Sequence, residues 1–327
     1  MKVFGPIPSR RLGKSLGINH IPPKICTYSC IYCQLGNTLK MQTNREKFYK
    51  AEEIKQEIEY KVKKLKARNE KIDYLSFVPD GEPTLDKNLG KIIDLIRPLN
   101  IKIAIITNSS LICDKEVRDD LCKADWVSIK VDAVTENIWK KIDRPFGKLN
   151  LSAIKKGILD FAKNFKGELV TETMLVNGIN DDTEELNKIA TFISEIKPNK
   201  SYISTPIRPP ALKSVKPASE HNINIAYNIF YKKGLNVECT VDYEGNAFAF
   251  TGNAEQDILS IISVHPMRED AIKEFLKKAK ANWTVIDKLI KKGDIIETIY
   301  GDNKFYKEIE KKSYYLEFYN FFFNNIL

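Results

Sequence analysis

The sequence is poor in the residues that build several common kinds of site, and it contains no long apolar run. It has only six cysteines and three histidines in 327 residues. The histidines, His20, His221 and His265, are scattered, and no Ser–His–Asp or HExxH pattern accompanies them, which argues against a hydrolase or a zinc protease. No apolar run reaches the roughly 18 residues of a membrane span, and the stretch after Lys2 lacks the apolar region of a signal peptide. We therefore expect a cytoplasmic protein without membrane contacts.

Cysteine is also too sparse and too unevenly spread for a disulfide framework. Cys26, Cys30 and Cys33 fall within eight residues, and the other three cysteines are far from them. Because the cytosol keeps thiols reduced, we interpret the triplet as a metal or cluster site. Thiolates are soft ligands that suit both zinc and iron–sulfur clusters. Structural zinc needs four protein ligands, and His20 is the nearest further candidate. A four-iron cluster on three cysteines leaves one iron open to an outside ligand.

The spacing C-x3-C-x2-C, with Tyr32 just before the last cysteine, resembles the signature of the radical S-adenosylmethionine (SAM) superfamily. The resemblance implies that Cys26, Cys30 and Cys33 hold a [4Fe-4S] cluster, and that the open iron binds the amino and carboxylate groups of SAM. It implies an enzyme in which the reduced cluster cleaves SAM to a 5′-deoxyadenosyl radical. It also implies reduced flavodoxin or ferredoxin as the electron donor.

Amphipathic helices and buried strands alternate along most of the chain. Residues 50–70 place their apolar side chains on one face of a helix, and the apolar run 72–78 that follows is typical of a buried strand. Further strands are predicted at 101–107, 126–132, 168–176 and 201–205, and helices at about 86–97, 114–123, 150–164, 182–196 and 219–233. Repeated strand–helix units indicate an α/β fold with a parallel sheet. The resemblance implies a partial (β/α)6 barrel, the catalytic domain, over residues 1–250.

The pattern changes near Gly252. Helices are predicted at 267–279 and in WTVIDKLIKKG, and DIIETIY and KFYKEI are typical of a hairpin with an Asp-Asn turn. Helices followed by a hairpin resemble a winged helix, so we predict a winged-helix-like domain over residues 251–327. We expect its aromatic tail, YYLEFYNFFFNN, to pack as a helix on the body of the protein. The module is compatible with binding nucleic acid, binding a peptide, or simply packing on the barrel.

Polar residues follow the predicted strands at their carboxyl ends, where parallel α/β folds bind ligands. Gly81 and Glu82 lie in PDGEPT, which resembles the Gly-Gly-Glu-Pro motif that holds the SAM amino group, with Asp80 in place of the first glycine. Asn108 follows the next strand, where it is suited to bind a ribose or a carboxylate, or to cap a turn. The resemblance therefore assigns Tyr32, Gly81, Glu82 and Asn108 to the cofactor site.

The strand WVSIKVD carries Ser128, Lys130 and Asp132 at alternate positions, so the three side chains point to one face. Buried polar side chains are costly without partners, so this face is expected to line the barrel lumen. A similar Asp-Leu-Lys pattern in glycyl-radical activating enzymes implies that Lys130 pairs with the SAM carboxylate. Arg144, in KIDRPF, is predicted to add a second cation for a carboxylate or phosphate. Glu172, within a strand, is predicted to hold SAM or substrate.

The segments GPIPSRRLGKSLGIN, CTYSCIYCQLG, GEPT, SIKVDA and KIDRP are together similar to the wyosine-synthase-like group of radical SAM proteins, which act on transfer RNA. Because no cysteine precedes Cys26, the second cluster of true wyosine synthases is not expected. The net charge of +9 permits a polyanionic partner, and Arg10 and Arg11 are candidates for substrate or cluster-side contacts. We predict a macromolecular substrate, RNA in preference to a peptide or protein. A non-enzymatic, metal-binding regulator of nucleic acid is the alternative from another class.

Overall fold

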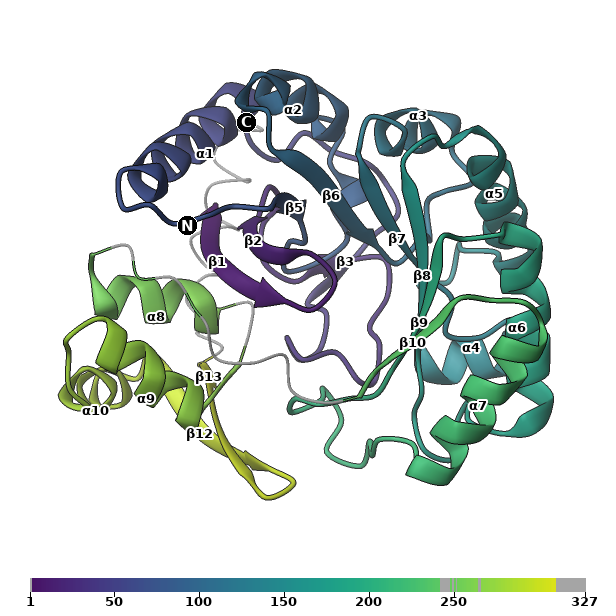
Figure 1. The fold of residues 1–327 in the computed structure, drawn as a ribbon. Helices are drawn as coiled ribbons and strands as arrows, with labels where there is room; N and C mark the ends of the chain where they lie inside the picture. The colour runs from purple at the N-terminus through teal and green to yellow at the C-terminus, as the bar shows by residue number, and fades with distance from the viewer. Residues whose placement is uncertain (1, 242–247, 249, 251, 264–265, 310–327) are drawn as a thin grey trace, which may run out of the picture.

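The main body of the protein is a curved sheet with helices on its outer side (Figure 1). The structure is a computed structural model that describes residues 2–241, 248, 250, 252–263 and 266–309. The sheet has eight strands in the order β1-β2-β5-β6-β7-β8-β9-β10. Neighbouring strands from β2 to β10 are parallel, and β1 is antiparallel to β2.

The strands of this sheet are β1 (Val3–Ser9), β2 (Gly13–Ile18), β5 (Tyr74–Phe77), β6 (Lys102–Thr107), β7 (Trp126–Lys130), β8 (Glu168–Met174), β9 (Lys200–Ser204) and β10 (Val237–Thr240). The helices between them are α1 (Ala51–Lys66), α2 (Leu89–Ile96), α3 (Lys115–Leu121), α4 (Glu136–Ile142), α5 (Leu151–Asn164), α6 (Thr183–Ile196) and α7 (Glu220–Lys232), with short 3-10 turns at Pro83–Leu85 and Arg97–Leu99. Two short strands, β3 (Ile25–Cys26) and β4 (Lys40–Met41), pair beside the sheet.

The predicted alternation of strands and helices, and the largely parallel sheet, are confirmed. The sheet is larger than the six strands of the predicted barrel, because β10 adds a seventh parallel strand and β1 an antiparallel edge. The strand β2 was not predicted from the sequence, because GKSLGI contains two glycines, which disfavour strands. In the part of the chain that the structure describes, β10 does not pair with β1, so the curved sheet stays open between them.

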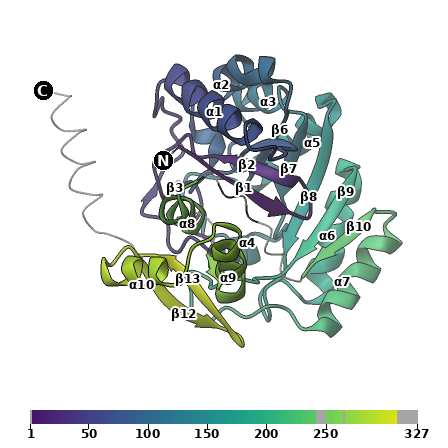
Figure 2. The same ribbon diagram turned by 60° about the vertical axis from the view of Figure 1, so that its left-hand side comes forward.

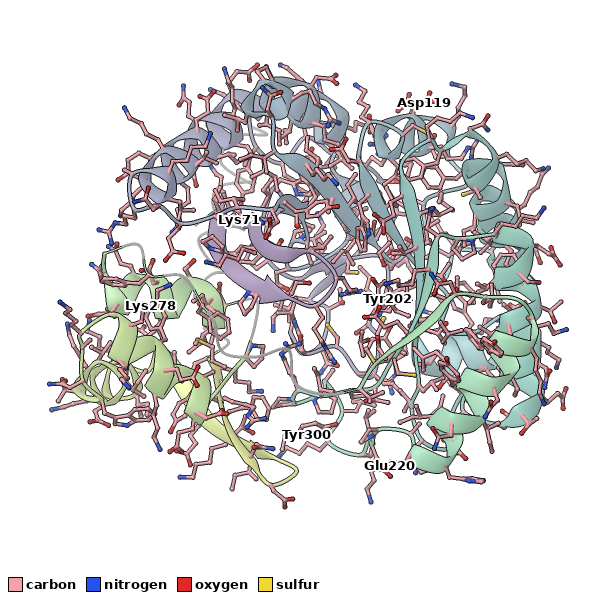
Figure 3. All side chains as sticks on the ribbon, in the orientation of Figure 1. Lys71, Asp119, Tyr202, Glu220, Lys278 and Tyr300 are labelled. Atoms are coloured by element: carbon pink, nitrogen blue, oxygen red, sulfur yellow. The ribbon has the colours of Figure 1, made fainter. Side chains whose placement is uncertain are left out.

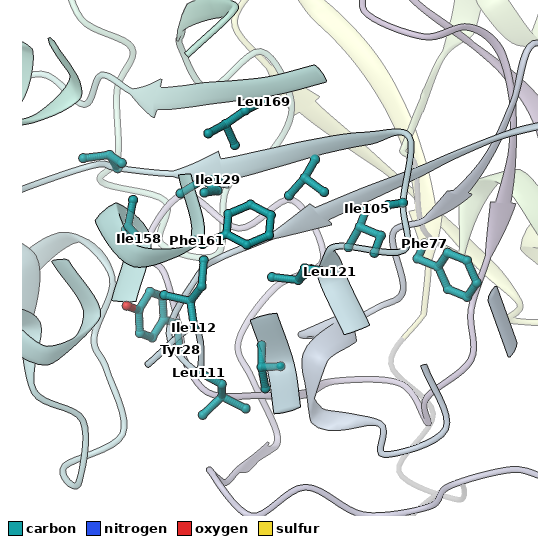
Figure 4. Packing of buried hydrophobic residues seen from close by; sticks show 14 of the residues in the cluster. Tyr28, Phe77, Ile105, Leu111, Ile112, Leu121, Ile129, Ile158, Phe161 and Leu169 are labelled. Carbon is teal, nitrogen blue, oxygen red and sulfur yellow. The ribbon is translucent and has the colours of Figure 1, made fainter. Parts of the chain in front are cut away.

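The outer face of the sheet and the helices that cover it form the main hydrophobic core. Figure 4 shows Ile105, Ile129 and Leu169, from three neighbouring strands, meeting Ile158 and Phe161 of α5. Each of these strand residues points outward from the sheet, so its neighbours in the same strand face the other way. The outer face is therefore mainly apolar, as expected for a sheet covered by helices, and its buried Thr171 and Ser201 satisfy each other by a hydrogen bond of 3.1 Å.

The inner face of the sheet is apolar only at one end. A small cluster of Leu12, Ala104, Trp126, Val170 and Tyr202 closes the lumen near the amino ends of the strands, and Figure 3 labels Tyr202 within it. Polar side chains follow nearer the carboxyl ends, among them Ser76, Ser128, Lys130, Glu172 and Ser204. Since Trp126 belongs to the inner cluster and its neighbour Val127 to the outer core, the alternation places Ser128 and Lys130 in the lumen, as predicted.

The C-terminal module has its own small sheet and its own core. Its elements are α8 (Ala254–Ile262), β11 (Met267–Arg268), α9 (Glu269–Lys278), α10 (Thr284–Lys291), β12 (Ile295–Tyr300) and β13 (Asn303–Glu308), with the antiparallel order β11-β13-β12. The two predicted helices and the hairpin are present, but the hairpin turn is Gly301–Asp302 and not Asp-Asn, because Tyr300 pairs with Asn303. The predicted aromatic tail lies in residues 310–327, outside the described residues.

The module packs beside β1 and α1, as both ribbon views show (Figures 1 and 2). Ile7 of β1 joins the module's apolar core, and Lys61 of α1 lies 3.7 Å from Asp257 of α8, both side chains being buried. At the other end of the module, the Tyr300 hydroxyl donates to the Pro206 carbonyl, 2.8 Å away, in the loop that follows β9. No helix in the described part of the chain has both the length and the apolar character to cross a membrane.

Candidate functional site

The cysteine loop follows β2 and lies at the carboxyl ends of the parallel strands. The structure brings together the thiols of Cys26, Cys30 and Cys33: Cys33 raises the pKa of Cys26, and both raise that of Cys30. The Cys33 amide donates to the Cys30 carbonyl at 3.1 Å, which folds the second half of the motif into a tight turn. Tyr28 packs edge-on against Trp139 and accepts a hydrogen bond from its indole at 3.1 Å. The loop is thus anchored to α4.

The thiols lie in a poorly hydrated environment. Burial raises the pKa of Cys26 to about 12, and the carboxylate of Glu82 adds to this effect. Burial and Asp143 raise the pKa of Cys30, and burial raises that of Cys33. Such thiols lose their protons when a cationic metal centre binds, because metal binding and deprotonation are linked.

The donor atoms suit an iron–sulfur cluster. Three soft thiols project from a single loop, and the Asn108 amide nitrogen lies 3.6 Å from the Cys26 sulfur, where it donates the kind of hydrogen bond that tunes cluster sulfurs. Among the described residues, no three His, Cys, Asp or Glu side chains lie close enough to hold one metal ion between them. Three thiols from one loop fit a cluster, because each can bind a different iron atom.

Gly81 is required by its contact with the cysteine loop. Its φ is 151°, and a Cβ at this position would lie 2.0 Å from the Ile25 carbonyl oxygen. The next residue, Glu82, donates its own amide to the same oxygen at 3.2 Å. The buried Glu82 carboxylate accepts hydrogen bonds from the Thr107 hydroxyl at 2.6 Å and from the backbone amide of Asn108 at 2.8 Å. Burial raises its pKa, although these hydrogen bonds oppose the shift.

Asn108 connects the loop after β6 to the cysteine loop. Its side-chain amide donates to the Thr27 hydroxyl at 2.8 Å, and the Ser110 hydroxyl donates to the same oxygen at 2.6 Å. Predicted residues from two separate segments, Gly81 and Glu82 in one and Asn108 in the other, therefore converge on the stretch that contains Cys26. That these residues also contact the cofactor remains a prediction.

A chain of charged side chains runs through the lumen towards the cysteines. Arg11, from the β1–β2 turn, donates to one oxygen of Glu172, and the Lys130 ammonium lies 3.8 Å from the other. Burial favours the neutral acid, but Arg11 and Lys130 outweigh it and lower the pKa of Glu172 to about 2. Burial likewise opposes the charge on Lys130, but Glu172 and Asp132 outweigh it and raise its pKa. Ser128 is buried two residues away on the same face.

Tyr32 links this series of charged side chains to the cysteine loop. The Lys130 ammonium lies 4.9 Å from the centre of the Tyr32 ring. The Tyr32 hydroxyl donates to Asp132 and lies 3.3 Å from Asp143, which also accepts from the Cys30 thiol at 3.4 Å. Burial raises the pKa of both carboxyls, and repulsion from Asp132 raises that of Asp143 further. Lys130 therefore lies between acidic side chains and the cysteines.

Two of these residues were not assigned to the lumen from the sequence. Asp143 precedes Arg144 in KIDRPF, and no sequence signal distinguished it from a loop aspartate. Arg11 was expected to contact the substrate or the cluster side, but the turn that contains it folds into the lumen. Arg144, by contrast, was predicted to supply a cation to the site, but its side chain is exposed and makes no hydrogen bond or ion pair with the residues that the structure describes. Its carbonyl accepts from the Ser29 amide at 3.2 Å.

Comparisons with known proteins agree with this arrangement. The radical SAM superfamily profile matches residues 21–190. A UPF0026 protein of Methanocaldococcus jannaschii is 49% identical over 93% of this chain and 94% of its own length. In fold, the chain is similar to a radical SAM methyltransferase from Sphaerobacter thermophilus, with a TM-score of 0.51 and 13% identity over 69% of this chain and 66% of that one. It is also similar to TYW1 with a lysine-pyruvate adduct bound, with a TM-score of 0.51 and 16% identity over 67% and 73%.

Half of the chain thus matches a family whose members use SAM and an iron–sulfur cluster, and the matched residues contain the three cysteines, Lys130 and Glu172. From the sequence profile and the parallel fold together, we conclude that this protein is an enzyme of the radical SAM superfamily.

Proposed function

We propose that this enzyme modifies a macromolecule, with RNA as the favoured substrate, by radical SAM chemistry. When bound at Cys26, Cys30 and Cys33, a [4Fe-4S] cluster would supply the electron that splits SAM into methionine and a 5′-deoxyadenosyl radical. The observation that supports this proposal best is the convergence of the three thiols, Tyr32 and Lys130 at the carboxyl edge of one lumen.

The remaining residues of the lumen would orient SAM. Lys130 supplies a cation for the SAM carboxylate, and Glu172 holds that cation beneath Tyr32. Asn108 and Ser128 add further polar groups, and the close approach of Gly81 places its backbone next to the cysteine loop. The apolar cluster at the amino ends of the strands closes the far end of the lumen, so reactants would enter from the cysteine side. Reduced flavodoxin or ferredoxin is the electron donor that we propose.

The charge distribution favours RNA over a peptide. Residues 1–50, which contain the cysteine loop, hold nine Lys and Arg against a single Glu. Neutralised phosphates contribute most of the sequence-independent affinity for nucleic acids. This excess, together with the sequence similarity to the wyosine-synthase-like group, supports a transfer RNA substrate. The C-terminal module has the helix, strand, helix, helix and hairpin order that supports a winged helix, but residues 252–309 hold ten Lys and Arg against ten Asp and Glu.

A peptide substrate is the second candidate, and one feature of the module favours it. β12 is an edge strand of the small sheet, and its Ile296 and Ile299 are 38% and 70% exposed. An exposed apolar edge is able to pair with an extended peptide. The regulator alternative has less support, because a plain metal sensor does not need a charged lumen beside its metal site.

The test is anaerobic reconstitution with iron and sulfide, followed by reduction in the presence of SAM. We expect cluster absorbance and 5′-deoxyadenosine, and we expect both to fall to background in Cys26→Ala, Cys30→Ala and Cys33→Ala. Cys113→Ala is the matched control, because Cys113 is exposed and outside the motif. Tight zinc binding without cluster absorbance would favour the regulator.

The substrate class needs a separate experiment. Transfer RNA from a strain that lacks the gene should lose one modified nucleoside, which mass analysis of digested nucleosides would detect. An unchanged nucleoside profile, with SAM cleavage intact, would favour the peptide.

A further inference from the structure

Two loops flank the cysteine loop at the mouth of the lumen. On one side, the Ile31 amide donates to the Ile142 carbonyl and the Phe146 amide donates to the Thr27 carbonyl, both at 2.9 Å. On the other side, the Leu212 amide donates to the Ile31 carbonyl at 3.0 Å. Residues 143–148 and 205–216 are therefore fixed by backbone hydrogen bonds on either side of the cysteines.

Both loops carry exposed cations. Arg144 and Lys148 lie on the first loop, and Lys213 and Lys216 on the second, and all four side chains are exposed. None of the four forms a salt bridge with an acidic side chain in the described part of the chain. The second loop and its flanks, residues 205–219, contain no Asp or Glu. We call Arg144, Lys148, Lys213 and Lys216 the basic rim.

Many surface cations elsewhere in the protein do have acidic partners. On the C-terminal module, Lys288 and Lys292 both reach Glu255, at 2.8 and 2.7 Å. On α6, Lys188 pairs with Glu184 at 2.5 Å. Exposed ion pairs contribute little to stability, but they cancel the local charge that a polyanion would meet. The basic rim keeps its charge uncancelled, and unlike other exposed lysines without an acidic partner it lies beside the cysteine loop.

We propose that the basic rim binds the phosphodiester backbone of RNA around the mouth of the lumen. This inference rests on the proposed RNA substrate and adds the surface that holds it. Phosphate contacts fix the position and orientation of a nucleic acid without reading its sequence. Contacts on both sides of the cysteine loop would hold one nucleotide over the lumen. Arg144 then contacts a phosphate of the substrate, which is one of the two roles predicted for it, and its exposed side chain permits this contact.

The loop that carries Lys213 and Lys216 is also tied to the site beneath it. Arg208 of this loop is buried and donates to the Gln34 side chain at 3.0 Å, next to Cys33. The same loop accepts the hydrogen bond from Tyr300 at Pro206. Its backbone is therefore held from below by the cysteine loop and from the side by the C-terminal module, which keeps two rim lysines in place.

The experiment measures binding of a fluorescein-labelled single-stranded RNA of about 20 nucleotides by anisotropy, over roughly 50 to 200 mM salt, without SAM or reductant. The test variant combines Lys148→Gln, Lys213→Gln and Lys216→Gln. The control removes three exposed lysines of the module, by Lys277→Gln, Lys280→Gln and Lys291→Gln. Each phosphate contact contributes about 0.7 to the slope of log K against log salt for single strands.

We expect the rim variant to lose about 2 units of slope and at least about ten-fold in affinity, and the module variant to change less than about two-fold. Arg144→Gln alone should lower the slope by about 0.7 from the wild-type value, whereas Arg144→Lys should keep the wild-type slope. Melting temperatures within the wild-type range would show that the variants are folded.

Equal losses in the rim and module variants would mean diffuse attraction and would overturn the proposal, as would an unchanged rim variant. A wild-type protein that cleaves SAM but does not bind this RNA would overturn the rim and leave the radical chemistry standing. The binding assay contains no SAM. If the protein binds RNA through the rim but never forms 5′-deoxyadenosine, only the proposed reaction is contradicted.

Discussion

At the scale of single residues, the chemistry of the lumen depends on which charges Lys130 meets. Glu172 lies between two cations, Arg11 and Lys130, and both interact with its oxygens. Because Arg11 compensates the charge of Glu172, the charge of Lys130 stays available for a carboxylate. Arg11 therefore influences the binding of a ligand at Lys130 only indirectly, through Glu172. Its role is that of a positioning residue.

This leads to a prediction about Arg11 and Glu172. Arg11→Met leaves Glu172 to pair with Lys130 alone, and we expect SAM affinity of the reconstituted protein to fall about ten-fold. Arg11→Met combined with Glu172→Gln should bring the affinity back to within about three-fold of wild type, because the uncompensated carboxylate is gone. Isothermal titration measures both values.

The control for this prediction is Arg10→Met, which removes the same charge from an exposed position in the same turn. If the double variant binds SAM as weakly as Arg11→Met does, then Arg11 contacts SAM directly or supports the fold, and the positioning role is wrong.

His20 makes stability depend on pH. The side chain is fully buried, its Nε2 lies 3.1 Å from the Pro83 carbonyl, and burial lowers its pKa to about 4. Since its ordinary pKa is about 6.5, the unfolded chain binds the proton first as pH falls. The stability that neutral His20 provides is therefore complete above about pH 6.5 and is lost progressively towards pH 4.

We expect the unfolding free energy of the cluster-free protein to fall, between about pH 7.5 and pH 5, by about 2 kcal/mol more than in His20→Gln. Urea denaturation at the two pH values gives the difference. The comparison with the variant removes the contribution of other titrating groups, and equal pH dependence in both proteins would show that His20 does not cause it.

At the scale of elements, the loop after β5 holds the cysteine loop through a glycine. In Gly81→Ala the new Cβ would meet the Ile25 carbonyl, so one of the two loops must move. We expect the variant to reconstitute with less than about half of the wild-type iron per chain, measured by iron analysis. Gly147→Ala is the control, because nothing lies within 4 Å of its new Cβ. Full iron content in Gly81→Ala would mean that the loops adjust freely.

Helix α8 attaches the C-terminal module to α1 partly through a buried ion pair. Removing one partner of such a pair leaves the other charge buried, so Asp257→Ala should lower the unfolding free energy by about 3 kcal/mol. Lys61→Met with Asp257→Leu should recover to within about 1 kcal/mol of wild type, because an apolar pair fills the same space. Urea denaturation measures the three proteins.

The contrast for this ion pair is Asp119→Ala, which breaks the exposed pair between Lys115 and Asp119 and should change stability by less than about 0.5 kcal/mol. If Asp257→Ala loses as little stability as Asp119→Ala, the Lys61–Asp257 pair does not help to hold α8 in place.

At the scale of the whole molecule, the parallel sheet brings the site together. Neighbouring strands from β2 to β10 point the same way, so the loops after them meet at one edge, where the cysteine loop, Asn108 and the basic rim lie. The opposite end is closed by apolar side chains and by the β1–β2 turn. The C-terminal module packs beside β1 at the open side of the sheet, and its hairpin reaches the loop after β9.

The features that could be predicted are those encoded by local spacing. The cysteine triplet is a motif within eight residues, and the strands at 101–107 and 126–132 are apolar runs bounded by turn residues. The alternation of Ser128 and Lys130 fixed their common face, because successive strand residues point to opposite sides.

The amino-acid sequence by itself determined the order of strands and helices, the cysteine loop and the lumen face of β7. Only the tertiary structure decided that Arg11 reaches Glu172, 161 positions away, that Cys30 and Tyr32 share Asp143, and that Arg144 is exposed on the rim. Local spacing controls backbone conformation over a few residues, whereas these contacts depend on how the sheet curves and where each loop turns. No local pattern encodes that curvature, because it results from packing across the whole sheet.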